Sequence, residues 1–176
     1  MKKLSKGFSL IEMLIVMMIF SILAVLATSS LATSLNGTRK SESLGHVREN
    51  IEYAMSIMER SLRAAKDLDC DASSSTRIVY KTANNIEASF EIVDCFIPPN
   101  DRGNIASASG GISRNLVIED DVMVVCGLLN SRFTCNQGIS GKPDSVTIRI
   151  TAEDIEAQGA GAVSYSSETQ ILLRNY

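Results

Sequence analysis

The most chemically unusual residue in this sequence is Glu12, a carboxylate inside an otherwise apolar run. Over residues 8–27, only Glu12 and two serines interrupt the apolar side chains. A carboxylate in hydrocarbon costs about 3 kcal/mol on insertion scales, so it needs a cationic partner or a shallow position near the headgroups. If the chain is cut after Gly7, the new amine of Phe8, on the same or a neighbouring copy, supplies such a cation.

Four cysteines form the second group with distinctive chemistry, and all of them lie beyond residue 66: Cys70, Cys95, Cys126 and Cys135. An even number in an exported region predicts disulfides, and three pairings are possible. We favour Cys126–Cys135, which would close a short hairpin, together with Cys70–Cys95, which would tie a helix end to an early strand. Zinc is the alternative, but the sequence has no CxxC pair, and its only histidine is His46.

The aspartates Asp67, Asp69 and Asp71 resemble the start of a calcium-binding loop. An EF-hand loop would then need glycine and glutamate where this sequence has Ala72 and Ile78. We therefore prefer a solvated acidic turn, with calcium as the alternative, and expect no cofactor. The sequence has no nucleophile elbow, phosphate-binding loop or two-histidine metal site, so we expect no enzymatic activity.

The elements that hold these residues begin with a membrane span. Residues 8–27 would extend about 30 Å as a helix, which is the thickness of one bilayer core. Residues 1–7 contain three lysines and no acid, which favours retention of this end in the cytoplasm and export of the remainder. A secretory signal peptide is the competing interpretation, but the apolar run is too long for one and contains a carboxylate.

Composition sets further limits on the function. The chain has 176 residues, of which 45% are hydrophobic and 21% charged, values that argue against wholesale disorder and against a polytopic membrane protein. Its net charge is −3, and removal of the three lysines in residues 1–7 would make it −6. An acidic chain offers no general electrostatic attraction for nucleic acid, so we expect no direct nucleic-acid binding.

Helical periodicity resumes after the span. Apolar residues recur every three or four positions within residues 39–66 and predict an amphipathic helix with one buried stripe. The residues of the stripe are Leu44, Val47, Ile51, Met55, Met58, Leu62 and Ala65.

Residues 67–176 carry β-rich segments and turn signals, which predict a domain with an antiparallel sheet laid over the helix stripe. We expect one loop over residues 98–113 and another over residues 158–167. The expected strands are residues 77–82, 86–93, 115–118, 122–129, 133–135, 146–151 and 170–174.

Residues 6–16, Lys-Gly-Phe-Ser-Leu-Ile-Glu-Met-Leu-Ile-Val, resemble the prepilin motif of type IV pilins and type II secretion pseudopilins. The resemblance implies that a prepilin peptidase cuts after Gly7, that Phe8 is N-methylated, and that Glu12 docks the subunit into a filament. It implies an α+β fold with the lollipop shape of pilins: a leader at 1–7, a long helix at 8–66 and a β-rich head at 67–176.

Residues 58–65 and the end of the chain at 172–175 resemble those of J-type minor pseudopilins and minor pilins. The implied function is that of a structural subunit in a type II secretion pseudopilus or in a type IV or competence pilus. The implied partners are other subunits, the prepilin peptidase and methyltransferase, and an inner-membrane assembly platform. The subunit would cross the inner membrane once, with its head outside the cytoplasm. The alternative is a membrane-anchored extracytoplasmic module that binds a ligand and forms no filament.

Overall fold

The computed structural model describes residues 9–95, 102–117, 121–127, 129–138, 143–155 and 163–173. It contains one long helix, α1 (Leu10–Arg63), followed by nine strands. The chain divides into two compact units, Met1–Arg39 and Lys40–Tyr176, and the boundary between them falls within α1. We call the second one the head unit.

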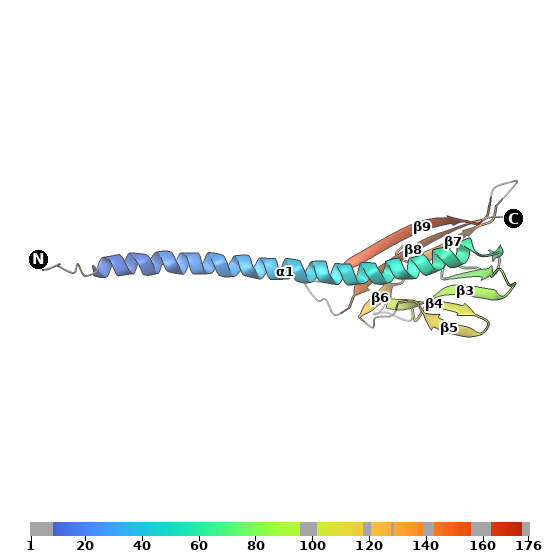
Figure 1. Ribbon diagram of the computed structural model, residues 1–176, viewed down its shortest axis with the longest axis horizontal. Helices are drawn as coiled ribbons and strands as arrows, with labels where there is room; N and C mark the ends of the chain where they lie inside the picture. Colours follow the sequence, from blue (N-terminus) through green and yellow to red (C-terminus); the bar gives the residue numbers. More distant parts are fainter. Residues whose placement is uncertain are drawn as a thin grey trace, which may run out of the picture. The chain divides into compact units, whose positions relative to one another are not determined.

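All strand pairings in the head unit are antiparallel, and the strands form one curled sheet in the order β1-β2-β3-β4-β6-β8-β7, with β5 on β4 and β9 on β8. Figure 1 shows α1 and these strands. The first five strands are β1 (Asp67–Asp69), β2 (Arg77–Lys81), β3 (Glu87–Val93), β4 (Arg102–Ser109) and β5 (Ile112–Asn115). The others are β6 (Val122–Val125), β7 (Arg132–Asn136), β8 (Ser145–Asp154) and β9 (Ser164–Leu172). The predicted α+β class, with an apolar N-terminal helix and an antiparallel sheet, is confirmed.

The core of the head unit forms where the predicted stripe of α1 meets the sheet. Val47, Ile51, Met58 and Leu62 are fully buried, and Ala54 joins them. Only Leu44 departs from the predicted stripe, since it is 40% exposed. Burial of each large apolar side chain contributes about 1.5–3 kcal/mol, so the spacing of the stripe determines which face of the helix meets the sheet.

Strand residues supply the other side of this core. Alternate residues of β8, from Val146 through Ile148 and Ile150 to Ala152, are fully buried, as expected for a strand with one covered face. Tyr80 of β2 stacks on Phe90 of β3 with ring centroids 5.4 Å apart. Burial raises the pKa of the Tyr80 phenol above its ordinary value, and a hydrogen bond with Ser61 opposes this shift.

The predicted loop over residues 98–113 is wrong for most of its length. Residues 102–109 form β4, which pairs with β3 along six residues and with β5 through a hairpin. Gly110 and Gly111 form the turn of that hairpin with positive φ angles of 58° and 85°. The segment that is rich in glycine, serine and alanine is therefore the interior strand β4, which pairs with β3, β5 and β6. Ile105 and Ala106 of this strand are buried.

Part of the second predicted loop, residues 158–167, is also a strand. β9 begins at Ser164, inside the region that we expected to be loop, and ends at Leu172. The other predicted strands are present, with ends that differ from the prediction. Of the predicted strand at 115–118, residues 116 and 117 lie outside any strand. The short strand β1 was not predicted.

Candidate assembly site and the disulfides of the head

Glu12 lies in the first turn of α1, where it caps the start of the helix. The backbone N–H of Ser9 donates a hydrogen bond to Oε2 of Glu12 over 3.3 Å. The carbonyl of Ser9 accepts the first bonds of the helix, from the N–H groups of Glu12 at 3.0 Å and Met13 at 3.3 Å. Ser9 is therefore the N-cap residue, and Glu12 occupies the third helical position, as in a capping box. The spacing Ser-x-x-Glu carried this signal, and the sequence reasoning missed it.

The carboxylate of Glu12 consequently has a structural partner within its own chain. A negative charge at this position also interacts favourably with the positive end of the helix dipole. Both effects reduce the energetic penalty of an acid at the edge of an apolar segment. Gly7 and Phe8, the predicted processing residues, lie outside the described residues.

The apolar part of α1 presents its side chains outward on all faces. From Leu10 to Leu26 every large apolar side chain is more than half exposed. A stretch of 18 residues in α1 reaches a mean hydropathy of 2.7 with no more than two charged residues, so the helix is long and apolar enough to cross a membrane. A helix that is apolar all round requires an apolar environment, either lipid or neighbouring helices.

Hydroxyl groups along this helix bond to its own backbone. Ser21 donates to the carbonyl of Met17 over 2.8 Å, and Thr28 donates to that of Ala24 over the same distance. Thr33 makes the equivalent bond to Ser29 at 3.0 Å. Each of these three hydroxyls bonds to a backbone carbonyl of the preceding turn. It is therefore not left without a hydrogen-bond partner when the helix lies in an apolar environment.

All four cysteines form disulfides, but the favoured pairing was wrong. The bonds are Cys70–Cys135 and Cys95–Cys126, with Cα atoms 5.5 Å and 5.8 Å apart. No free cysteine occurs in the described chain. Cys70 follows β1 and Cys135 lies in β7, so the first bond joins opposite ends of the sheet order.

The strand order explains why the favoured pairs do not form. β6 and β7 do not form a hairpin, since both pair with β8 at different positions along it. The pairing register places Cys126 opposite residue 150 of β8 and Cys135 opposite residue 146. These positions are four residues apart, or about 13 Å along the strand. Cys70 and Cys95 follow strands with β2 between them, so they are at least about 10 Å apart. Both separations exceed the Cα distance that a disulfide can span.

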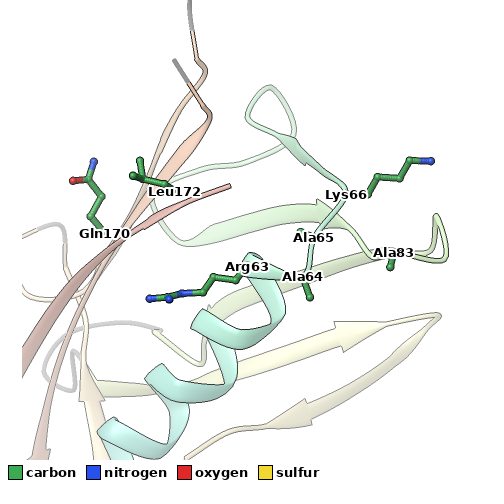
Figure 2. Close-up of a pocket in the computed structure, with 7 residues that line it drawn as sticks. All are labelled: Arg63, Ala64, Ala65, Lys66, Ala83, Gln170 and Leu172. Atoms are coloured by element: carbon green, nitrogen blue, oxygen red, sulfur yellow. The ribbon is translucent and has the colours of Figure 1, made fainter. Parts of the chain in front are cut away.

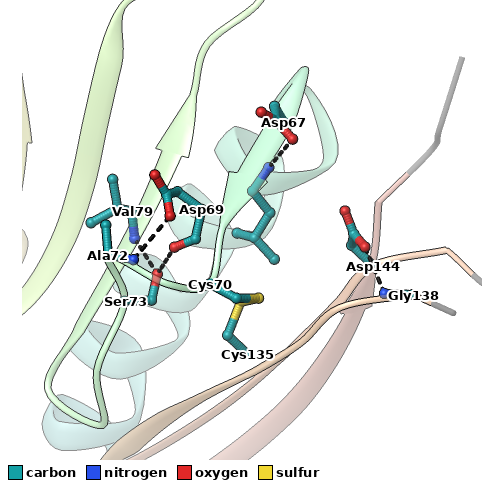
Figure 3. The surroundings of a disulfide bond; sticks show 10 residues. Asp67, Asp69, Cys70, Ala72, Ser73, Val79, Cys135, Gly138 and Asp144 are labelled. Carbon is teal, nitrogen blue, oxygen red and sulfur yellow. Dashed lines mark hydrogen bonds between the residues drawn. A yellow bond between two sulfur atoms is a disulfide. The ribbon is translucent and has the colours of Figure 1, made fainter.

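The Cys70–Cys135 bond, drawn in Figure 3, links the two ends of the strand order and so helps to close the curled sheet. Close by, the N–H of Phe133 in β7 donates to the carbonyl of Ser75 over 2.8 Å. β7 is thus fixed to the segment between β1 and β2 by one covalent bond and one hydrogen bond. These links hold the two ends of the sheet together around the core.

The aspartates near this disulfide are engaged in local structure. Asp67 accepts a hydrogen bond from the N–H of Leu68 at 3.0 Å and lies 3.7 Å from Nζ of Lys81. Asp69 accepts from the N–H of Ala72 at 2.9 Å, which forms the turn after β1 (Figure 3). Within the described part of the chain, no three acidic, cysteine or histidine side chains gather as a metal site. A calcium site at Asp67, Asp69 and Asp71 stays an alternative prediction.

Polar contacts also connect α1 to β9. Nε of Arg48 donates to Oε1 of Glu52 over 2.6 Å, and the hydroxyl of Tyr165 donates to the same oxygen over 3.3 Å. The guanidinium of Arg48 lies 5.9 Å from the centre of the Tyr165 ring. The hydrogen bond from Arg48 holds the pKa of Glu52 below its ordinary value. These three side chains join the exposed flank of the helix to β9.

The first turns of α1 in the head unit also contact the end of β8 and the turn before β6. Ser43 donates to Oδ2 of Asp154 over 2.5 Å. Nδ1 of His46 lies 3.8 Å from Oδ2 of Asp121, with the histidine side chain 51% exposed.

Residues 2–28 match the family model of the prokaryotic N-terminal methylation motif. The match covers the predicted processing residues, the capped start of α1 and the exposed apolar stretch. No curated protein sequence and no solved structure is significantly similar to the chain. The chain therefore combines a recognised N-terminal methylation segment with a disulfide-linked β-sheet head.

Proposed function

We propose that this chain, which its methylation motif and α+β architecture mark as a member of the type IV pilin and pseudopilin family, is a minor subunit of a filament. The filament is a type II secretion pseudopilus or a type IV or competence pilus. The subunit has no catalytic activity and no cofactor of its own. It is anchored in the inner membrane by the apolar part of α1, with its head exported, before it enters the filament.

The observation that carries this proposal is the combination of the motif with Glu12 at the start of an exposed apolar helix. Cleavage after Gly7 would leave Phe8 as the terminal residue, directly before the N-cap Ser9. A methylated amine at Phe8 would then lie within a few residues of the capping carboxylate. Other pilin subunits, the peptidase and methyltransferase, and an assembly platform are the partners that this role requires.

The Glu12 carboxylate offers a direct test, because its capping and charge roles can be separated. Glu12→Gln keeps a side-chain oxygen that accepts from the N–H of Ser9 but removes the charge. Glu12→Leu removes both. We expect both variants to insert into the membrane, and we expect both to be lost from filaments at least tenfold, as measured by immunoblotting of sheared filaments or purified pseudopili.

A matched control is Ser21→Ala, which removes a hydroxyl from the same helix without changing its charge. It should enter filaments as the unmodified chain does. If Glu12→Gln is incorporated normally, the charge of Glu12 plays no part in assembly. The alternative role, an anchored ligand-binding module, predicts that neither substitution at Glu12 changes the behaviour of the protein.

A further inference from the structure

The outer edge of β9 carries backbone groups that face away from the sheet. β9 pairs with β8 along its whole length and with no other strand in the described chain. Just beyond its ends, the N–H of Leu173 donates to the carbonyl of Asp144 at 2.9 Å and that of Asp154 donates to the carbonyl of Val163 at 3.4 Å. Odd-numbered residues therefore bond to β8, and even-numbered residues direct their N–H and C=O groups outward.

β9 lacks the features that usually protect a sheet edge. Natural edge strands are commonly short, bulged, or marked by proline or lysine. β9 has nine residues, pairs with β8 in uninterrupted register, and contains no proline or lysine. Its single charged residue, Glu168, pairs with Arg149 of β8. Among the described residues no strand pairs with these outward groups, so the edge is suited to pairing with another extended chain.

A groove of about 840 Å³ adjoins the end of this edge. Figure 2 shows the side chains that line it. It is lined by Arg63, Ala64, Ala65, Lys66, Ala83, Gln170 and Leu172. Leu172 is 59% exposed, and the side chain of Arg63 is 64% exposed. The groove therefore offers an apolar surface and the guanidinium of Arg63 on the side of β9, with Lys66 on its far side, in a chain whose net charge is −3.

The strand edge and the groove together indicate which kind of chain would pair with β9. Antiparallel pairing of β9 with β9 of a second copy would bring Ser164 and Ser166 of that copy toward Arg63 and Lys66. The only carboxylate on the second strand, Glu168, would remain near the centre of the pair. Arg63 pairs with Glu59 of its own helix over 3.3 Å. Lys66 donates to the neutral Oδ1 of Asn85 over 3.1 Å. Both side chains remain exposed, and a second copy would bring no carboxylate to either of them, so a segment with carboxylates at one end fits better than a second copy.

We propose that β9 binds an extended acidic segment of a partner protein as an additional strand. The main chain of the partner pairs with the even-numbered residues of β9, and its terminal carboxylates contact Arg63 and Lys66. Backbone hydrogen bonds provide affinity in this mode, while the groove provides specificity. The proposal concerns the head unit alone, and it holds whether or not the chain enters a filament.

The test uses the full chain in detergent micelles and a displayed library of random twelve-residue peptides. We expect the selected peptides to be rich in β-branched residues and to carry aspartate or glutamate toward one end. A fluorescent copy of a selected peptide then measures affinity by anisotropy. Arg63→Gln with Lys66→Gln should weaken binding at least tenfold, whereas Arg77→Gln with Arg114→Gln removes the same charge elsewhere and should change it less than twofold.

The backbone contribution is tested at Ser166. Ser166→Pro removes an outward N–H, and Ser166→Ala keeps it, while both lose the hydroxyl that accepts from Oγ1 of Thr151. Binding should fall at least tenfold in the proline variant and remain within twofold in the alanine variant. In the unmodified chain, bound peptide should slow hydrogen exchange at the amides of residues 166, 168 and 170, a measurement that does not depend on the folding of a variant.

Three results would overturn the proposal: a library that yields no binder, selected peptides without acidic residues, or equal binding by the proline and alanine variants with unchanged exchange at β9. Self-association of the chain that Ser166→Pro abolishes would assign the edge to a second copy instead.

Discussion

Cys95 and Cys126 are joined across an intervening strand. Cys95 follows β3 and Cys126 follows β6, and β4 lies between these strands in the sheet. Asp94 adopts a left-handed conformation with φ 61°, which turns the chain away from the extended path of β3 directly before Cys95. The disulfide passes close to Gly103 of β4, where a side chain would meet the sulfur atoms of both cysteines and the carbonyl of Val93.

Gly103→Ala should therefore destabilise the head. The added Cβ would lie 2.9 Å from Sγ of Cys95 and 3.2 Å from that of Cys126, and closer still to the backbone carbonyl of Val93. Because a backbone atom cannot move aside as a flexible side chain does, either the strands shift or the disulfide is lost. We expect the free energy of unfolding to fall by about 2–4 kcal/mol in urea titrations followed by circular dichroism.

Gly45→Ala is the matched control for this substitution. Gly45 lies in α1 within the head unit, and a Cβ added there meets no atom within 4 Å. It should leave the stability unchanged or raise it by up to about 1 kcal/mol, since alanine favours a helix. Equal effects at the two glycines would show that the disulfide does not pass over Gly103 as described.

The two disulfides should contribute about equally to stability. The residues of Cys70–Cys135 are 65 apart in sequence, but Cys95–Cys126, whose residues are 31 apart, lies inside that loop. With the inner bond intact, the outer bond closes a path of about 34 residues, so the chain-entropy model gives each bond about 4 kcal/mol. Replacing either pair by serine should thus lower the free energy of unfolding by a similar amount in urea titrations.

The pairing itself is checked by mass spectrometry of the nonreduced protein after proteolysis. We expect linked peptides that join Cys70 to Cys135 and Cys95 to Cys126. Linked peptides that join Cys126 to Cys135 would contradict the strand order of β6, β7 and β8, since that bond requires the two cysteines to lie side by side.

The contrast between the helix and the disulfides shows which features the sequence could predict. The stripe from Val47 to Leu62 was predictable because helical periodicity is local and repeats over several turns. The disulfide pairing was not, because it depends on β6 and β7 both pairing with β8 rather than with each other. β4 was missed because small residues such as Gly103 and Ala106 are typical of loops, whereas here they fit a strand beneath a disulfide. The capping role of Glu12 was readable from Ser9, three residues earlier.

The contact between Glu52 and Arg48 should make part of the stability depend on pH. The pKa of Glu52 is lowered in the folded state, so the ionised form is stabilised relative to the unfolded chain. This contribution is present above the ordinary glutamate pKa of about 4.3 and is lost as the pH falls through the lower folded value. Glu52→Gln should therefore be less stable than the unmodified chain at pH 7 and equally stable in strong acid.

Urea titrations at pH 7 and at pH 2 provide this comparison. Glu49→Gln is the control, since it removes one exposed glutamate charge from the same helix. A difference between Glu52→Gln and the unmodified chain that persists unchanged into strong acid would assign the effect to lost packing against Tyr165 rather than to charge.

Processing at Gly7 distinguishes a filament subunit from an anchored binding module. If a prepilin peptidase acts here, mass spectrometry of the membrane form should show a chain that begins at N-methylated Phe8 and has lost three lysines, so that its net charge changes from −3 to −6. A bulky Gly7→Val substitution should leave the uncut precursor in the membrane, since the apolar helix is unchanged and insertion does not require cleavage. Ser5→Val, two residues earlier in the leader, is the control and should be processed normally. An anchored module needs no new amine beside Glu12, so its mature form would retain the leader or begin far beyond Phe8, and either result would remove the basis for assembly through Glu12.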